Sequence, residues 1–520
     1  MKRALATGIL VFACAFASAP ANSEALSSLS AFSYPVGTTN PAAQNAFDQG
    51  LLFHFAHQRQ AAENEFQQAL RLDPAIASAA WGEALAAGPA VDEPMSVDDQ
   101  RSALVALKQA EDLYPRASHE ERLLIRALTK RYSSDPRESR AKLDAAYRDA
   151  MLAAFRQYPD DPVVGALTAE AQLQAMDLAN AWDKDGVPSA EMLGLRKTLD
   201  AVLTSTPNNP GANVVCVLAY ANSPDPVRGL PCASHLSELA ALPDPGDARL
   251  FAFANRIYQR VGNWQAVVTG AERAINADTT SAARSGVSSD ASGDAEHDAE
   301  WLIVGALRVD DHSALLAKGG EVLARANSPL LDLLDLRRND LSDVLARHEP
   351  RREDTHARMI FLYTRAMALA KNNNVAAVAE QLKAFDTLVA GFKGRDADVA
   401  AMLRDTITAY QVKGLGDSAH AIASLHDAIR IADRLGPEVF PEWADPVHEQ
   451  LAALLLDAGR PGDAEEYFRE ELRVVPRDPH ALRGLEQSLR AEDRADDAAF
   501  VRAQWRSVWR GTSEPSISEL

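Results

Sequence analysis

The sequence predicts an all-α protein in which helical hairpins repeat and stack side by side. A pattern of small, aromatic and proline residues recurs at matching offsets in separate parts of the chain. A proline-bounded joint occurs three times between segments of helical periodicity. No segment shows the convincing alternation of apolar and polar residues that marks a half-buried strand. Because stacked repeats grow by addition, the 520-residue length does not fix a domain count.

The best copy of the repeat lies near the amino terminus. Counted from Ala43, a period of about 34 residues places small residues where two helices approach, aromatic residues between them and a proline at the end of the second helix. These positions are Gly50, Phe53, Ala62, Phe66, Ala69 and Pro74. A second copy starts at Asp445 and a degenerate one at Asp247. This pattern is the tetratricopeptide repeat, so the predicted fold is a superhelical solenoid of tetratricopeptide-type hairpins.

The joint between hairpins has two prolines separated by two polar residues. In each copy the first proline ends a helix and the second can stand in the first turn of the next, where the preceding side chain can cap the helix. The capping residues are Asp161, Asn209 and Asp478. We therefore expect a helix to begin directly after each of them.

The first residues predict export. Lys2 and Arg3 precede an apolar run and then small residues with a cleavage site at Ala19–Ala21, the order of a secretory signal. Residues 1–21 are predicted to be removed, leaving a periplasmic or secreted protein. Retention as a membrane anchor and lipid attachment through Cys14 are the alternatives.

Composition sets the remaining boundaries. Residues 22–40 are expected to form a frayed, extended N-terminal segment, and residues 41–278 an N-terminal repeat array. Residues 279–299 consist almost entirely of Ser, Ala, Gly, Asp and Thr, which predicts a flexible linker. Residues 300–510 form the predicted C-terminal array, and residues 511–520 a disordered tail.

Charge argues against nucleic-acid partners. The formal net charge is −20, and no basic stripe is present for a phosphate backbone to follow. No segment after the signal is apolar for about 20 residues, so no membrane insertion of the mature chain is expected.

The sequence offers no catalytic residues, no cofactor and no metal site. Zinc-protease spacing, a phosphate-binding loop and a serine nucleophile elbow are all missing. His54 with His57, and His297 with Glu300, are isolated pairs that surface histidines explain as well. Cys216 and Cys232 are close enough in sequence to staple neighbouring helices, although two buried free thiols fit equally.

A partner-binding groove is the predicted functional feature. In a superhelix of hairpins the first helix of each repeat lines the concave side. In the best repeat this makes Phe47, Leu51 and His54 the residues expected to touch a partner. The alternative is that Phe47 and Leu51 pack against a neighbouring element.

Longer stretches resemble a family of bacterial tetratricopeptide repeat proteins, mostly of unassigned activity. The resemblance is carried by 66–74 (FQQALRLDP) and 80–89 (AWGEALAAGP), and it continues through 143–147, 158–161, 260–264 and 454–490. It implies a helical-repeat fold over nearly the whole mature chain. Family members carry a histidine-rich middle that looks like a metal or active site, in segments aligned with 211–220 and 249–258. This chain has no histidine in either segment, so that site is not carried over.

The sequence therefore predicts a non-enzymatic scaffold that binds a protein or peptide through a concave groove. A metal-dependent or cryptic enzyme on the same repeats is the alternative, with His54, His57 and acidic residues brought together by the fold. A structural role in an envelope assembly is a third possibility. The partner, the pathway and the oligomeric state are not encoded in any recognisable pattern.

Overall fold

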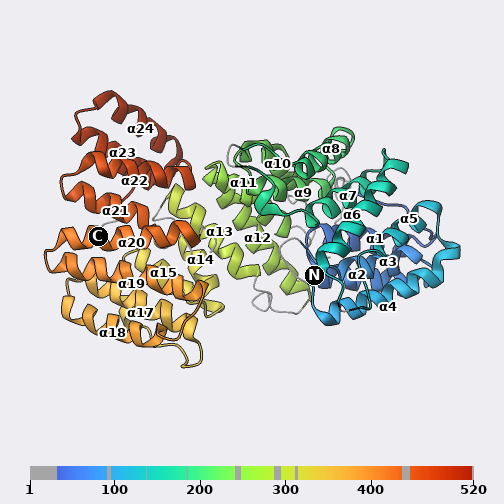
Figure 1. Ribbon diagram of the computed structural model, residues 1–520, viewed down its shortest axis with the longest axis horizontal. Helices are drawn as coiled ribbons and strands as arrows, with labels where there is room; N and C mark the ends of the chain where they lie inside the picture. Colours follow the sequence, from blue (N-terminus) through green and yellow to red (C-terminus); the bar gives the residue numbers. More distant parts are fainter. Residues whose placement is uncertain are drawn as a thin grey trace, which may run out of the picture.

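The computed structural model describes residues 32–90, 95–135, 137–183, 186–239, 248–285, 294–310, 314–435 and 446–517. Within these ranges the chain forms helices and no strand, apart from an isolated bridge between Trp182 and Pro188 (Figure 1). The predicted signal at 1–21 lies outside the described residues. The α-helices are α1 (Pro41–Phe55), α2 (Arg59–Leu72), α3 (Ala77–Ala86), α4 (Val97–Leu113), α5 (His119–Leu128), α6 (Arg140–Gln157), α7 (Pro162–Gln174), α8 (Ala190–Ser205), α9 (Pro210–Ala221), α10 (Leu230–Leu239), α11 (Ala248–Arg260), α12 (Trp264–Ser285), α13 (Asp294–Val309), α14 (Ala314–Arg325), α15 (Leu330–Arg337), α16 (Leu341–Ala346), α17 (Thr355–Lys371), α18 (Val375–Val389), α19 (Arg395–Gly414), α20 (Ser418–Leu435), α21 (Val447–Asp457), α22 (Pro461–Val474), α23 (Pro479–Ala491) and α24 (Ala495–Val508).

The turn inside the hairpins is a repeated structure. In each of six hairpins a residue with positive φ follows the first helix, and the next N–H donates to the carbonyl five residues earlier. This hydrogen bond satisfies a carbonyl at the helix end, as in a Schellman motif. The positive-φ residues are His57, Gly262, Asn373, Gly416, Gly459 and Asp493, and Asn327 and Asn339 form the same turn after α14 and α15. A glycine is also required at Gly262 for steric reasons, because a Cβ there would lie 2.3 Å from the carbonyl oxygen of Pro476.

The joints between hairpins begin helices as the sequence predicts. Asp161 Oδ1 accepts from the N–H groups of Val163 and Val164 at the start of α7. Asn209 and Asp478 cap α9 and α23 in the same way, each followed by a proline in the first turn. The three predicted caps and helix starts are confirmed.

Two hydrophobic cores meet on one helix. The first core runs from the N-terminal residues to α12 and also includes Val475 and Val508 of the last repeats, and the second runs from α12 to α24. On α12, Val267 belongs to the first core and Val268 to the second. In Figure 1 α12 and α13 lie between the two halves, and the hairpins from α17 to α24 stack in order on the left. The tetratricopeptide-type solenoid is therefore continuous across its middle.

The first array closes back on itself. Helix α1 packs against α9 as well as against its neighbours α2 and α3. The ring of Phe55 lies where a Cβ on Gly211 would come within 2.5 Å, so the small residue lets α1 and α9 approach. His57 stacks edge-on against Phe253 of α11, with ring centroids 5.0 Å apart. Helices α1, α3, α5, α7, α9 and α11, the first helices of successive hairpins, form what we call the inner layer.

The second array ends on α13, far from it in sequence. Arg308 of α13 lies 2.8 Å from Asp478 at the start of α23, and both side chains are about 95% buried. The two ring nitrogens of His480 lie 2.7 Å from the Leu307 carbonyl oxygen and 2.6 Å from that of Ser516. These contacts fix the last repeats against the centre of the molecule.

The predicted linker and tail differ from the structure. Of residues 279–299, those up to Ser285 continue α12 and those from Asp294 begin α13, while 286–293 lie outside the described residues. Alanine-rich segments have high helix propensity, and here the packing of α12 on α13 extends the helices into a stretch of loop-like composition. The tail is docked through residue 517, since Pro515 is buried and Trp509 Nε1 donates to the Ser513 carbonyl.

Candidate functional site

Two of the three predicted partner-binding residues are inaccessible. Phe47 and Leu51 have no exposed surface. Phe47 packs against Phe66 of α2 and against Tyr34, with ring centroids 5.5 and 6.4 Å away. Other parts of this chain therefore cover both side chains, as in the alternative that they pack against neighbouring elements, and contact of either with a partner stays a prediction.

Residues 32–40, which we call the strap, cover this part of the inner layer. Their exposure alternates, with Phe32, Tyr34, Val36, Thr38 and Asn40 turned towards the helices and the residues between them exposed. A period of two is that of an extended chain. The segment is extended, as the sequence predicts, but it is docked where fraying was expected.

Side chains of α1 and α5 hold the main chain of the strap. The N–H of Tyr34 donates to Asp48 at 3.0 Å, and Gln44 Nε2 donates to the Tyr34 carbonyl at 2.8 Å. The N–H of Val36 donates to Gln44 Oε1 and that of Gly37 to Glu121 Oε1, both at 3.1 Å. Most of this recognition does not depend on the strap's side chains.

Aromatic groups anchor the strap. The ring of Phe32 meets Phe55 edge-on, with centroids 6.2 Å apart. The hydroxyl of Tyr34 donates to Glu120, and burial together with this bond raises the pKa of Tyr34. Burial also raises the pKa of Asp48 and, with Asp161 nearby, that of Glu120. The strap site is therefore acidic and largely dry.

A second candidate site surrounds His54. Its Nε2 lies 3.0 Å from Oε2 of Glu170, which belongs to α7, and both side chains are about 90% buried. The pair lines a small pocket together with His57, Arg59 and the residues after α3. The pocket has a volume of about 20 Å³, room for roughly one water molecule.

Basic groups around Glu170 stabilise its ionised form. Burial alone would raise the pKa of Glu170, but His54, Arg131 and His57 lower it to about 2. Gln174 donates to Glu170 at 3.0 Å and to the Pro89 carbonyl at 3.0 Å, and Arg131 donates to the same carbonyl at 2.6 Å. An ionised carboxylate accepts only, so Nε2 of His54 is the donor in this contact. The pair lies beside a pocket for one water-sized occupant, and the same network also ties α1 to α7.

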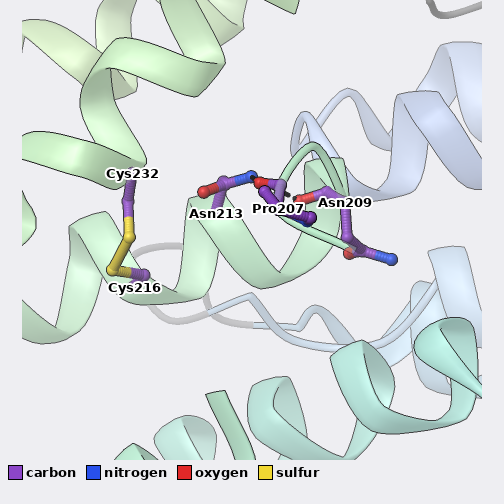
Figure 2. The surroundings of a disulfide bond; sticks show 5 residues. All are labelled: Pro207, Asn209, Asn213, Cys216 and Cys232. Atoms are coloured by element: carbon purple, nitrogen blue, oxygen red, sulfur yellow. Dashed lines mark hydrogen bonds between the residues drawn. A yellow bond between two sulfur atoms is a disulfide. The ribbon is translucent and has the colours of Figure 1, made fainter. Parts of the chain in front are cut away.

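The two cysteines form a disulfide between α9 and α10 (Figure 2). Their Cα atoms are 6.2 Å apart, and both residues are buried. One turn before Cys216, the amide of Asn213 donates to the carbonyl oxygens of Pro207 and Asn209 at 2.8 Å each. The start of α9 and its middle are thus both fixed.

The second histidine pair from the sequence, His297 with Glu300, lies on α13. His297 Nδ1 lies 3.7 Å from Glu300 Oε2, and its other nitrogen accepts from Trp301. No group of three or more His, Cys, Asp or Glu side chains with metal-binding geometry occurs within the described ranges. No helix in the same ranges is long and apolar enough to span a bilayer.

Sequence reasoning missed Glu170, Arg131 and Tyr34. Glu170 stands in a helix whose other residues are nearly all apolar or small, and an ionisable residue in such a stretch signals a buried partner. Tyr34 belongs to an alternating stretch, Phe-Ser-Tyr-Pro-Val-Gly, that signals an extended and half-covered segment. Arg131 follows a helix without any local signal.

These features define a tetratricopeptide-type helical-repeat protein with a covered inner layer. No family model and no curated protein matches the sequence. Among solved structures it is similar to a human IFIT1 dimer with m7Gppp-AAAA, at 13% identity and a TM-score of 0.32, covering 90% of each chain. It is also similar to yeast Tom70, at 16% identity and a TM-score of 0.27, covering 89% of this chain and 96% of that one. Because these TM-scores are low, the fold class is based on the helical hairpins of this chain and not on the two similarities.

Proposed function

We propose that the chain is an exported scaffold that binds an extended segment of a protein or peptide partner on the inner layer of its N-terminal array. One observation carries the proposal. The inner layer already holds an extended segment, the strap, mainly through hydrogen bonds to its main chain. Main-chain hydrogen bonds with pockets for alternate side chains are a general way to bind extended peptides.

Export is supported by two features. Lys2 and Arg3 followed by an apolar run and small residues have the order of a secretory signal. The buried disulfide between Cys216 and Cys232 suits an oxidising compartment such as the periplasm or the outside of the cell.

The test is capture followed by direct binding. The mature chain is used to capture proteins from its own cell envelope, and each captured protein is purified and titrated calorimetrically. We expect Gln44→Ala, which removes two hydrogen bonds to a bound extended main chain, to change the partner's affinity, and Val105→Glu, at a 67% exposed position on α4, to leave it unchanged. A partner that is sensitive to Val105→Glu and indifferent to Gln44→Ala would refute the inner layer as the binding surface. Absence of any directly binding protein would refute the scaffold.

A cryptic enzyme is the second candidate, favoured by the His54–Glu170 pair beside a water-sized pocket. In that case the purified chain turns over a small substrate, and both His54→Gln and Glu170→Gln abolish turnover. Metal analysis of the purified protein separates a metal-dependent version from a metal-free one. Turnover that survives both substitutions would remove this pocket from consideration.

A further inference from the structure

The strap is bound in the manner of a separate peptide. It forms no helix of its own, and its contacts reach residues well removed in sequence, such as Glu120, 86 positions from Tyr34. Three consecutive inward side chains, Phe32, Tyr34 and Val36, lie against the helices while their main-chain groups pair with side chains. A segment held in this way resembles a ligand tethered to its receptor.

The strap site needs an occupant. Asp48 and Glu121 are 7% and 4% exposed, and each accepts an N–H from the strap. Release of the strap removes one hydrogen bond from each, although Asp48 keeps a bond from Gln44 and Glu121 keeps one from Ser78. Phe47 would lose its cover at the same time, so the loss of buried hydrogen bonds and apolar contacts costs free energy. An empty site is therefore disfavoured, whereas replacement of one extended segment by another conserves the hydrogen bonds.

We propose that the partner binds in the strap site by exchanging with the strap, which thereby acts as a built-in competitor. This inference rests on the proposed scaffold function and specifies where the partner binds and how access is controlled. Because the strap is tethered to α1, it is present at high effective concentration, and only a better-matched segment displaces it.

The site specifies the chemistry of the partner. The two aromatic contacts require large apolar side chains at alternate positions, and Glu120 requires a hydroxyl or another donor on the second of them. Gly37 is exposed, so the site requires no particular side chain of the partner at the corresponding position. Carboxylates at Asp48, Glu120 and Glu121 disfavour acidic segments. The partner is an extended, uncharged or basic peptide segment with this alternation.

The experiment measures binding of the strap sequence in trans. The probe is a fluorescein-labelled peptide with the sequence of residues 31–40, titrated into the full mature chain by anisotropy. In a Phe32→Ala/Tyr34→Ala chain the tethered competitor is weakened. We expect the probe to bind this chain at least about tenfold more tightly than the unaltered chain, where few sites are open. A Thr39→Ala chain, altered at an exposed strap position, should behave as the unaltered chain.

A probe in which alanine replaces its tyrosine should not bind. If the doubly substituted chain is folded by circular dichroism and the unmodified probe does not bind it, the exchange model is wrong. Hydrogen exchange on the unaltered chain provides a test that does not depend on the variant's folding. The amides of Tyr34, Val36 and Gly37 should exchange at least about tenfold faster than those of α1, by local release. Exchange at the same rate as α1 would make the strap a permanent part of the fold and overturn the inference.

The two proposals can fail separately. If a captured partner binds the mature chain but the strap peptide does not compete with it, the scaffold function stands and the exchange model falls. If the strap peptide binds in trans but no partner is found, the exchange stands and the proposed function falls.

Discussion

The packing of Phe66 against two glycines predicts that one substitution, Gly82→Ala, lowers the stability of the protein when Phe66 is present and raises it when Phe66 is replaced. Phe66 on α2 is fully buried, and its ring fills the space left by Gly50 on α1 and Gly82 on α3. A Cβ on Gly82 would lie 2.5 Å from the ring, about 1 Å inside an ordinary carbon–carbon contact of roughly 3.5–4.0 Å. Forcing an extra methyl group into such a site costs about 1–3 kcal/mol.

Helix propensity opposes this cost. Replacing a glycine by alanine within a helix gains about 1 kcal/mol, because the backbone loses less entropy on folding. Gly82→Ala should therefore destabilise the protein by up to about 2 kcal/mol. In a Phe66→Leu background the ring is absent, the clash disappears, and the same substitution should stabilise by about 1 kcal/mol.

Urea unfolding of the four proteins in the double-mutant cycle, followed by circular dichroism, measures this coupling. Gly320→Ala in α14 is the matched control, since its Cβ would lie 3.4 Å from Leu334 and only the propensity gain should appear. If Gly82→Ala has the same sign in both backgrounds, the steric role assigned to the repeat's small residues is refuted.

Three further predictions concern long-range contacts, and urea titrations test each of them. Replacing Cys216 and Cys232 by alanine should cost about 3 kcal/mol, because the disulfide closes a loop with a sequence separation of 16 in the unfolded chain; an unchanged midpoint would contradict this. Glu170→Gln should cost roughly 3 kcal/mol at neutral pH, since the pKa of Glu170 is lowered to about 2 in the folded state from about 4.5. That contribution is present above pH 4.5 and lost as the pH falls through 2, so the difference between the two proteins should vanish in acid. Asp478→Asn leaves Arg308 buried without its counter-charge and should cost about 3–5 kcal/mol; a loss below about 1 kcal/mol would argue against a buried ion pair.

Local features of the fold could be predicted from the sequence because their causes are local. The caps of α7, α9 and α23 come from one side chain and one proline each, and the hairpin turns from one residue with positive φ. Gly50 and Phe66 occur at the repeat's spacing because the ring of Phe66 on α2 fills the space that Gly50 leaves on α1. Such short-range determinants are visible in any single copy of the repeat.

The candidate sites could not be predicted in the same way. His54 and Glu170 are 116 positions apart, and His480 lies 173 positions from Leu307. These contacts depend on how far the array curves, which is the sum of small rotations at every hairpin. The sequence indicated that α1 has an apolar face, but it did not indicate that α9 and the strap would cover it.

Closure of the first array changes what an inner layer can do. An open solenoid offers a wide concave surface, whereas here α1 reaches α9, and a pocket beside His54 has a volume of about 20 Å³. Such a pocket has room for roughly one water molecule. The strap site is different, because its occupant is a short extended segment that continues into α1 at Asn40, and other residues of α1 also pack against α9 and α2. In the exchange model the partner binds at the strap site, and where the strap must leave first, the rate of strap release is the upper limit on how fast the partner can bind there.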